Sequence, residues 1–428
     1  MTEQFQKLKK FIILYVVTYL ICCVSMCIVY ALPQDRIRQH VAQSKEIFEE
    51  EGSYPRLISW RISSQLDNFT DALMLLMAGY EGEGPFYQDA FRNTFPAIEG
   101  NTPTQTLIRI YTDADTEYIV NNYNRYWHGY LLYLKPLLCF FSYRGIRLLW
   151  GILQVSLTSI VLILFIRRRM VTEIVPFLAV YLFLDPAAMS LSLQHGIIFL
   201  LVVIQFLVIL LFEDTYAARE DIWLYHFFIT GCLTSFFDFL TYPLVTFGIT
   251  GAFIIYKYAK AGKDGFISFI KIFFTWGCGY VLFWAGKWVG GSIILKSNII
   301  RDAASAVRFR SGYQTVDQSF SYLGVLFRNL GARWIFLGIL SLAFFICVWI
   351  GKTKRTGVQN KARLLILFAL LPFVWYLVVA NHSYEHFWFT FRELAVTVYV
   401  LVLYGTACLG NSSVRKINLS PMIERKNK

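Results

Sequence analysis

The fold of this chain is decided by one polar stretch, residues 33–147, which contains Leu66-Asp67-Asn68-Phe69-Thr70-Asp71 and ends in Arg144-Gly145-Ile146-Arg147. A single apolar segment precedes this stretch, and apolar segments make up most of the chain after it. Segments of this kind can cross about 30 Å of hydrocarbon. The sequence therefore predicts a membrane protein with one large hydrophilic loop after its first helix, and this loop offers a place for chemistry outside the bilayer core.

The composition favours a polytopic helical membrane protein over a soluble domain. Hydrophobic residues make up 56% of the chain and charged residues only 16%. A membrane β-barrel is disfavoured because the apolar segments are continuous rather than alternating. The net charge of +12 comes from Lys and Arg in short connectors between apolar segments. Membrane proteins set their orientation in this way, so we expect no nucleic-acid partner.

The first apolar segment and the cysteines do not indicate a secreted protein. The first apolar segment, residues 11–32, is too long for the core of a signal peptide and no cleavage site follows it, so we expect a retained helix. All eight cysteines lie in apolar segments without metal-ligand spacing. We interpret them as small buried hydrophobic side chains rather than as a disulfide or metal framework.

Placing the basic connectors on one side gives an all-α arrangement of about ten transmembrane helices with a large extracytoplasmic first loop. The helices are expected at residues 11–32, 148–166, 174–189, 195–212, 223–237, 243–256, 266–284, 335–350, 364–380 and 394–409. Both termini are then cytoplasmic, and we expect a multi-pass protein of a bacterial plasma (cytoplasmic) membrane. The chain divides into an N-terminal module (1–166), a middle bundle (167–286), a second outer loop (287–334), and C-terminal helices with a basic tail (335–428).

The first loop is expected to contain its own helices. Residues 34–50 have the pattern of a helix that ends near Gly52, and residues 67–77 read as an amphipathic helix with an acidic start. Residues 82–103 are rich in Gly, Pro and Asn and are expected to form a loop. Residues 130–141 are too short to span a bilayer and suit a helix at the membrane surface.

Asp67 and Asp71 are the candidate catalytic residues. They are four residues apart, so in a helix they share one face. Carboxylates at the outer membrane surface can act as a general base or hold a divalent cation such as Mg²⁺ or Mn²⁺, which leaves the metal unknown. The position of Asp67 at the start of the expected helix also suits an N-cap.

Three further candidates lie where polar groups meet the apolar segments. Arg125 and His128 belong to a polar and aromatic cluster at the end of the first loop, where His128 suits a phosphate or a sugar hydroxyl and the aromatic residues suit interfacial anchors. Asp238 is surrounded by phenylalanines between two apolar segments. It must face a cavity or a partner, because an unpaired charge in lipid is costly.

The remaining candidates suit a lipid phosphate. Arg308 and Arg310 are cations in the second outer loop, on the side that orientation rules disfavour, and Arg binds phosphate in a bidentate manner. Contact with anionic lipid headgroups is the alternative. His382 and His386 are four apart, but the zinc-protease pattern requires Glu directly after the first His. We therefore expect them, with Arg392, to bind phosphate or sugar rather than zinc.

The end of the first loop carries a resemblance. The sequence Tyr126-Trp127-His128-Gly129-Tyr130 is followed by Leu131-Leu132, by Pro136-Leu137-Leu138, and by basic residues that enter the next apolar segment. This order is similar to the loop-closing segment of GT-C type glycosyltransferases, as is the layout of one helix, a large acidic outer loop and a helix bundle. The resemblance covers about the first third of the chain and is one of layout.

The resemblance implies an inverting transferase that takes a sugar from a polyprenyl-phosphate carrier at the outer face. The acceptor would be a cell-envelope glycan, lipid or protein, with Asp67 or Asp71 as the base and Arg and His groups neutralising the departing lipid phosphate. No Gly-rich nucleotide-binding loop is present in the sequence. The alternatives are a transporter or flippase of a lipid-linked glycan precursor, an O-antigen-type polymerase, and a non-catalytic assembly protein.

Overall fold

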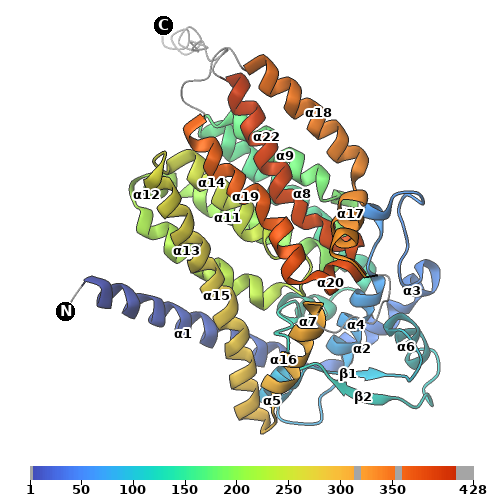
Figure 1. Ribbon diagram of the computed structural model, residues 1–428. Helices are drawn as coiled ribbons and strands as arrows, with labels where there is room; N and C mark the ends of the chain where they lie inside the picture. The colour runs from blue at the N-terminus through green and yellow to red at the C-terminus, as the bar shows by residue number, and fades with distance from the viewer. Residues whose placement is uncertain (1–2, 313–319, 352–358, 411–428) are drawn as a thin grey trace, which may run out of the picture.

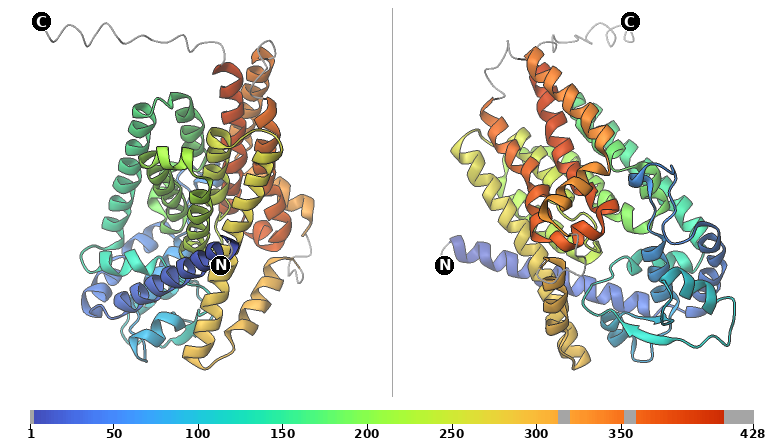
Figure 2. Two further views of the ribbon diagram at one scale, coloured as in Figure 1. Left: turned by 90° about the vertical axis from the view of Figure 1, so that its left-hand side faces the viewer. Right: turned by 45° about the vertical axis from the view of Figure 1, so that its right-hand side comes forward.

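The computed structural model describes residues 3–312, 320–351 and 359–410. The described chain is mostly helical, with the first loop folded against one end of a helix bundle and the last helix ending at the other (Figure 1). Two further views show the same division between loop and bundle (Figure 2). The basic tail and the connector at 352–358, which carry part of the orientation signal, lie outside the described residues.

Five helical segments of the described chain are long and apolar enough to cross a membrane, which supports a helical membrane protein. They are α1 (Glu3–Tyr30), α8 (Tyr143–Arg167), α11 (Leu193–Leu211), α15 (Lys263–Leu295) and the segment Phe387–Leu409, which includes most of α22 (Ala395–Gly410). A sixth arises if α17 (Tyr322–Gly331) and α18 (Trp334–Gly351), bent by 82°, count as one span. The predicted number of ten is therefore not reached on length and hydropathy alone.

Helices nevertheless occupy the other predicted positions. These are α9 (Val171–Phe183), α13 (Glu220–Phe237), α14 (Val245–Tyr258) and α19 (Gln359–Val378). α1 crosses α13 and α15 obliquely (Figure 1) and is tied to α15 by a hydrogen bond from the Tyr19 hydroxyl to the Gly286 carbonyl, 3.0 Å.

The helix expected at 174–189 is broken, contrary to the prediction. α9 ends before Asp185, whose φ of 66° is left-handed, and α10 (Pro186–Leu191) begins immediately after it. The carboxylate of Asp185 pairs with Arg61 and Arg333, which holds this unusual conformation in place. Pro186 then starts α10, because a proline is tolerated at the first helical position.

The connectors after α8, α11 and α14 lie together at the end of the bundle that faces away from the first loop (Figure 1). Arg168 pairs with Glu213 of the short helix α12 (Glu213–Ala218) at 3.5 Å, and Lys257 pairs with Glu173 at 2.8 Å. These ion pairs join connectors that are distant in sequence. Successive helices that link these connectors therefore run in opposite directions.

The first loop folds as a compact unit with more secondary structure than expected. Its elements are α2 (Gln34–Gln43), α3 (Lys45–Glu51), η1 (Ile62–Ser64), α4 (Asn68–Gly79), α5 (Phe86–Arg92), β1 (Thr94–Ala97), α6 (Pro103–Ile110), β2 (Ile119–Asn122) and α7 (Leu131–Leu138). The helix predicted at 34–50 divides at Ser44, although it does end at Gly52. The loop predicted at 82–103 is wrong in part, because α5 and β1 lie within it. β1 pairs antiparallel with β2.

α4 forms the centre of the loop unit, and the prediction that it is amphipathic is wrong. Every residue of α4 except Phe69 is buried, because α2, α6 and α7 pack around it. α7 contributes Leu131, Leu134 and Leu138 to this core, and the Lys135 ammonium donates to the Ala78 carbonyl at 3.0 Å. A helix that is apolar all round is expected where neighbours cover every side.

Residues 126–130 attach the loop unit to the helix bundle. The Trp127 indole donates to the Phe283 carbonyl of α15 at 2.9 Å, and the Gly129 amide donates to the Phe236 carbonyl of α13 at 3.0 Å. A Cβ at Gly129 would lie 2.4 Å from that carbonyl oxygen, so only glycine fits. The aromatic cluster thus packs the loop unit against α13 and α15.

Candidate functional site

Asp71 is fully buried and caps a helix that is distant in sequence. Its carboxylate accepts hydrogen bonds from the Leu193 amide (2.9 Å) and the Gln194 amide (3.2 Å) at the start of α11, and from the Tyr143 hydroxyl. Burial raises the pKa of Asp71, and these hydrogen bonds oppose the rise. Both carboxylate oxygens are therefore engaged, and the expectation that this acid is exposed at the membrane surface is wrong.

Asp67 is also buried, and it is the N-cap of α4. Its two oxygens accept hydrogen bonds from the Thr70 amide (3.0 Å) and hydroxyl (2.9 Å). Desolvation raises the pKa of Asp67 to about 7, with Asp71 adding to the rise and Thr70 opposing it. Asp67 also interacts electrostatically with Arg392, another predicted site residue.

Asp238 differs from both acids because one of its oxygens is free. Oδ1 accepts hydrogen bonds from the Thr241 amide (3.0 Å) and hydroxyl, whereas Oδ2 has no hydrogen-bond partner among the described residues. Desolvation raises the pKa of Asp238 to about 6, and hydrogen bonding from Thr241 and from the Leu240 and Phe239 amides opposes the rise. A buried polar atom left unpaired in a native fold calls for an explanation such as a ligand.

Two further side chains share the surroundings of Asp238. Tyr280 of α15 interacts electrostatically with Asp238 and with Glu393, a buried acid from the 3₁₀ turn η2 (Phe391–Leu394). Glu393 accepts from the Leu244 amide at 3.4 Å through Oε1, and its Oε2 has no partner within the described ranges. Two carboxylates, each with one oxygen that lacks a partner in the described ranges, therefore act electrostatically on the same tyrosine.

An aromatic pocket of about 270 Å³ lies where α15, α16 (Ile299–Arg310) and α19 meet. Tyr280 lines it, and so does Leu240, two residues after Asp238. Val281 and Val378 form part of its rim and are 62% and 54% exposed. The pocket therefore opens on the apolar side of the helices, and its other lining residues include Tyr126, Trp284, Trp288 and Trp375.

Arg125 and Arg310 are the cations of the aromatic pocket. Their guanidinium carbons lie 5.6 Å and 5.7 Å from the centroid of the same ring, that of Tyr126. Arg125 also pairs with Asp302 at 3.3 Å, and its Nε is buried without a partner in the described part of the chain. Arg308, two residues before Arg310, is exposed and does not line the pocket.

His382 holds Arg310 in position. Its Nδ1 accepts a hydrogen bond from Arg310 at 2.5 Å, and its Nε2 donates to the Leu240 carbonyl at 2.7 Å. Desolvation and the charge of Arg310 lower the pKa of His382 well below its usual value, so the ring is neutral. His386, whose ring centroid lies 4.8 Å from that of His382, has its pKa lowered to about 4 by burial.

Two other predicted residues have structural roles in this fold. His128 accepts from the Tyr130 hydroxyl (3.0 Å) and donates to the Tyr123 carbonyl (2.8 Å), and its buried ring is neutral because desolvation lowers its pKa. Arg392 is fully buried and donates to the carbonyls of Leu184 and Trp388, both at 3.3 Å. The hydrogen bonds of His128 and Arg392 thus stabilise the loop segments that they join.

The described residues hold no group of three or more His, Cys, Asp and Glu side chains arranged to bind a metal ion. The carboxylates of Asp67 and Asp71 are occupied by protein donors, so the expected Mg²⁺ or Mn²⁺ gains no ligand set from them. The pair of Asp238 and Glu393 offers two free carboxylate oxygens, which suit a proton or a hydroxyl group.

The sequence interpretation missed Glu393 and Tyr280. Glu393 follows Arg392 inside an apolar segment, and an ionisable residue there is itself a signal for a functional site. Tyr280 and the tryptophans of α15 had no such signal, because aromatic residues are common in any membrane helix.

Comparison with protein-family models, with curated proteins and with solved structures finds no match to this chain.

Proposed function

We propose that the chain is a GT-C-like membrane glycosyltransferase, which moves a sugar from a polyprenyl-phosphate donor to a cell-envelope glycan, lipid or protein acceptor on the extracytoplasmic face. The observation that carries this proposal is the aromatic pocket, which is lined by Arg125 and Arg310 and by Tyr280, the tyrosine that interacts electrostatically with both acids. An apolar opening suits the polyprenyl chain, and paired guanidiniums suit its phosphate.

The donor would enter between α15 and α19, because Val281 and Val378 of the rim are exposed there. Trp284 and Trp288 would contact the first isoprenoid units, while Arg310, oriented by His382, would bind the phosphate. Fixed cations aimed at a leaving group stabilise the charge that develops on it. The sugar would then lie towards Tyr280 and the free oxygens of Asp238 and Glu393.

The reaction in this arrangement is a direct displacement. The acceptor hydroxyl oxygen bonds to the anomeric carbon, and the bond from that carbon to the lipid phosphate oxygen breaks with its electron pair on the phosphate. The hydroxyl proton passes to a carboxylate. Asp238 suits this base better than Asp67 or Asp71, because its Oδ2 is free and the oxygens of the other two are engaged. Displacement from one side inverts the anomeric centre.

The proposal includes ten transmembrane helices with both termini in the cytoplasm of a bacterium. Support comes from helices at all ten predicted positions and from the connectors that gather at one end of the bundle, opposite the first loop. Lys and Arg in those connectors favour the cytoplasmic side.

The test is turnover of defined donors by the purified chain in liposomes. A panel of polyprenyl-phosphate hexoses, pentoses and amino sugars is supplied with a lipid extract from cell envelopes, and free polyprenyl phosphate is measured by mass spectrometry. We expect one donor to be consumed, and Asp238→Asn to lower the rate about a hundredfold or more, the usual contribution of a general base. A flippase would move donors across the bilayer intact, and that result would contradict the proposal.

A further inference from the structure

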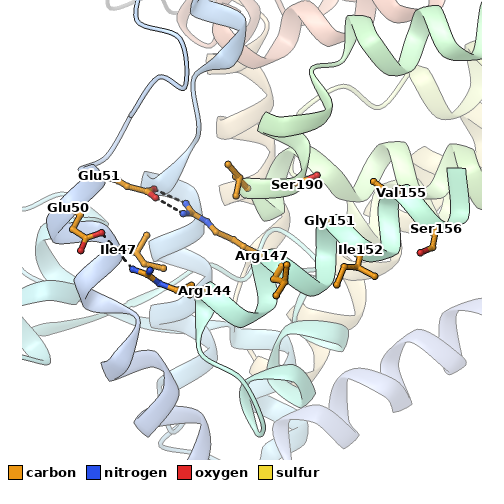
Figure 3. A pocket seen from close by; sticks show the side chains of 12 residues that line it. Ile47, Glu50, Glu51, Arg144, Arg147, Gly151, Ile152, Val155, Ser156 and Ser190 are labelled. Atoms are coloured by element: carbon orange, nitrogen blue, oxygen red, sulfur yellow. Dashed lines mark hydrogen bonds and ion pairs between the residues drawn. The ribbon is translucent and has the colours of Figure 1, made fainter. Parts of the chain in front are cut away.

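A second groove, of about 720 Å³, shares no lining residue with the aromatic pocket. It lies between α3, α8 and α10 (Figure 3). Its floor is formed by Leu148, Ile152 and Val155, which are exposed and lie on one face of α8 because they are spaced by four and three residues. α8 is long and apolar enough to cross a membrane, so this exposed apolar face suits contact with lipid acyl chains.

The head of the groove contains two ion pairs (Figure 3). In the inner pair, Arg147 donates to both carboxylate oxygens of Glu51, at 2.7 Å and 3.0 Å, and to the Asn68 side chain at 2.8 Å. Its guanidinium also lies over the Tyr143 ring, 4.4 Å from the centroid. Arg147 is only 6% exposed, so this pair is closed and belongs to the packing of the loop unit.

The outer pair, Arg144 and Glu50, is open. The two side chains are 71% and 69% exposed, and their charged atoms are 3.7 Å apart. Exposed pairs of this kind contribute little to stability, so they separate readily. Figure 3 shows both at the end of the groove opposite Ile152 and Val155. Each has room for a second partner of opposite charge.

The charges at the head of the groove cancel, since two acids face two arginines. An anionic headgroup would meet Glu50, and a cationic one would meet Arg144, whereas a headgroup with both charges satisfies each. We propose that this groove binds a zwitterionic phospholipid of the phosphatidylethanolamine type. Its phosphate contacts Arg144, its ammonium contacts Glu50, and one acyl chain lies along the floor of α8. This inference does not depend on the proposed transferase activity.

The test is lipid retention by the purified chain, measured by native mass spectrometry. Delipidated protein is titrated with phosphatidylethanolamine and with phosphatidylglycerol of the same acyl chains. The native chain is expected to bind the zwitterionic lipid more tightly, and Glu50→Gln and Arg144→Gln each to weaken that binding about tenfold. Both side chains are exposed, so these variants keep the fold. The matched control is Glu81→Gln, which breaks an exposed pair with Arg38 away from the groove.

A charge-reversal series tests whether the charges of Glu50 and Arg144 decide which lipid binds. Glu50→Lys should shift the binding preference to phosphatidylglycerol. The double variant Glu50→Arg/Arg144→Glu should restore the preference for the zwitterionic lipid. Gly151→Leu should weaken the binding of both lipids, because a Cβ at position 151 would already lie 3.4 Å from the Cβ of Ser190 across the groove. Equal affinity of the native chain for the two lipids, or no response to Glu50→Lys, would overturn the proposal.

Discussion

Asp71 and Asp238 are both buried carboxylates, yet their neighbours give them different roles. Asp71 receives three hydrogen bonds and completes the start of α11, whereas Oδ2 of Asp238 has no hydrogen-bond partner in the part of the chain that the structure describes. Residue type and burial are the same in both cases. Whether both carboxylate oxygens accept hydrogen bonds therefore distinguishes a structural acid from a candidate base.

Substitution of these two acids should separate stability from turnover. In Asp71→Asn, an amide group faces the backbone N–H groups of α11, and we expect a loss of about 2 kcal/mol in unfolding free energy. In Asp238→Asn, the remaining carbonyl oxygen still accepts from Thr241, and we expect lost turnover without lost stability. Thermal unfolding in detergent, followed beside the turnover assay, measures both. Equal destabilisation by the two variants would argue against these roles.

The pH dependence of turnover should follow Asp238. Desolvation raises its pKa to about 6, so this carboxyl is mainly protonated at pH 5 and mainly ionised at pH 7. A base acts only when ionised, and the rate should therefore rise about tenfold over this interval. A pH–rate profile tests this expectation. Residual turnover in Asp238→Asn should lack the rise, and an unchanged profile in that variant would assign the titration to another group.

Single residues were the hardest part to predict from sequence. An acidic start to the helix at Asp67 was readable, and its N-cap role was one of two interpretations. Two of the three partners of Asp71, Leu193 and Gln194, lie more than 120 residues further along the chain, and Tyr143 lies 72 residues along, so no local pattern indicates them. The free oxygen of Asp238 depends on the same kind of long-range packing.

Elements were more predictable, because apolar length and periodicity act locally. Helices occupy all ten predicted positions, although the segment at 174–189 is divided between α9 and α10. The breaks were missed where tertiary contacts decide them: Ser44 suits a helix interior, yet its hydroxyl accepts from the Tyr143 amide at 2.9 Å. The break at Asp185 depends on Arg61 and Arg333, although Pro186 gave a local sign of it.

The junction of the first loop with α13 should depend on Gly129. In Gly129→Ala the new methyl group overlaps the Phe236 carbonyl oxygen, which must move, at a cost of about 1–3 kcal/mol. Because Phe236 precedes Asp238 by two residues, turnover should fall as well. Thermal unfolding checks the stability effect. Gly277→Ala on α15 is the matched control, since a Cβ there meets nothing within 4 Å in the described structure and should leave stability unchanged or raised.

On the scale of the whole molecule, the candidate site is assembled from segments that are far apart in sequence. Arg125 comes from the end of the first loop, Arg310 from α16, and Asp238 from the turn between α13 and α14. All three residues are recognisable as candidates in the sequence, but no local pattern groups them, and Arg308 and Arg310 are equivalent candidates there. Only the direction of each side chain on α16 distinguishes those two arginines.

The orientation of the whole chain is testable by cysteine labelling. After replacement of the eight native cysteines, Asp113→Cys in the first loop should react with a membrane-impermeant maleimide in intact cells. Asp214→Cys, whose native side chain is 99% exposed in the connector after α11, should react only after permeabilisation. The reverse pattern would put the first loop in the cytoplasm and remove the basis for an extracytoplasmic reaction.

In the proposed reaction, the aromatic pocket holds the lipid phosphate of the donor. Binding of polyprenyl monophosphate to the purified chain, measured by native mass spectrometry, tests this most directly. Arg310→Gln should weaken binding about tenfold to a hundredfold, the value of one or two charge-assisted hydrogen bonds, while Arg308→Gln on the same helix should bind as the native chain does. Equal binding by the native chain and Arg310→Gln, or equal losses in both variants, would contradict the account.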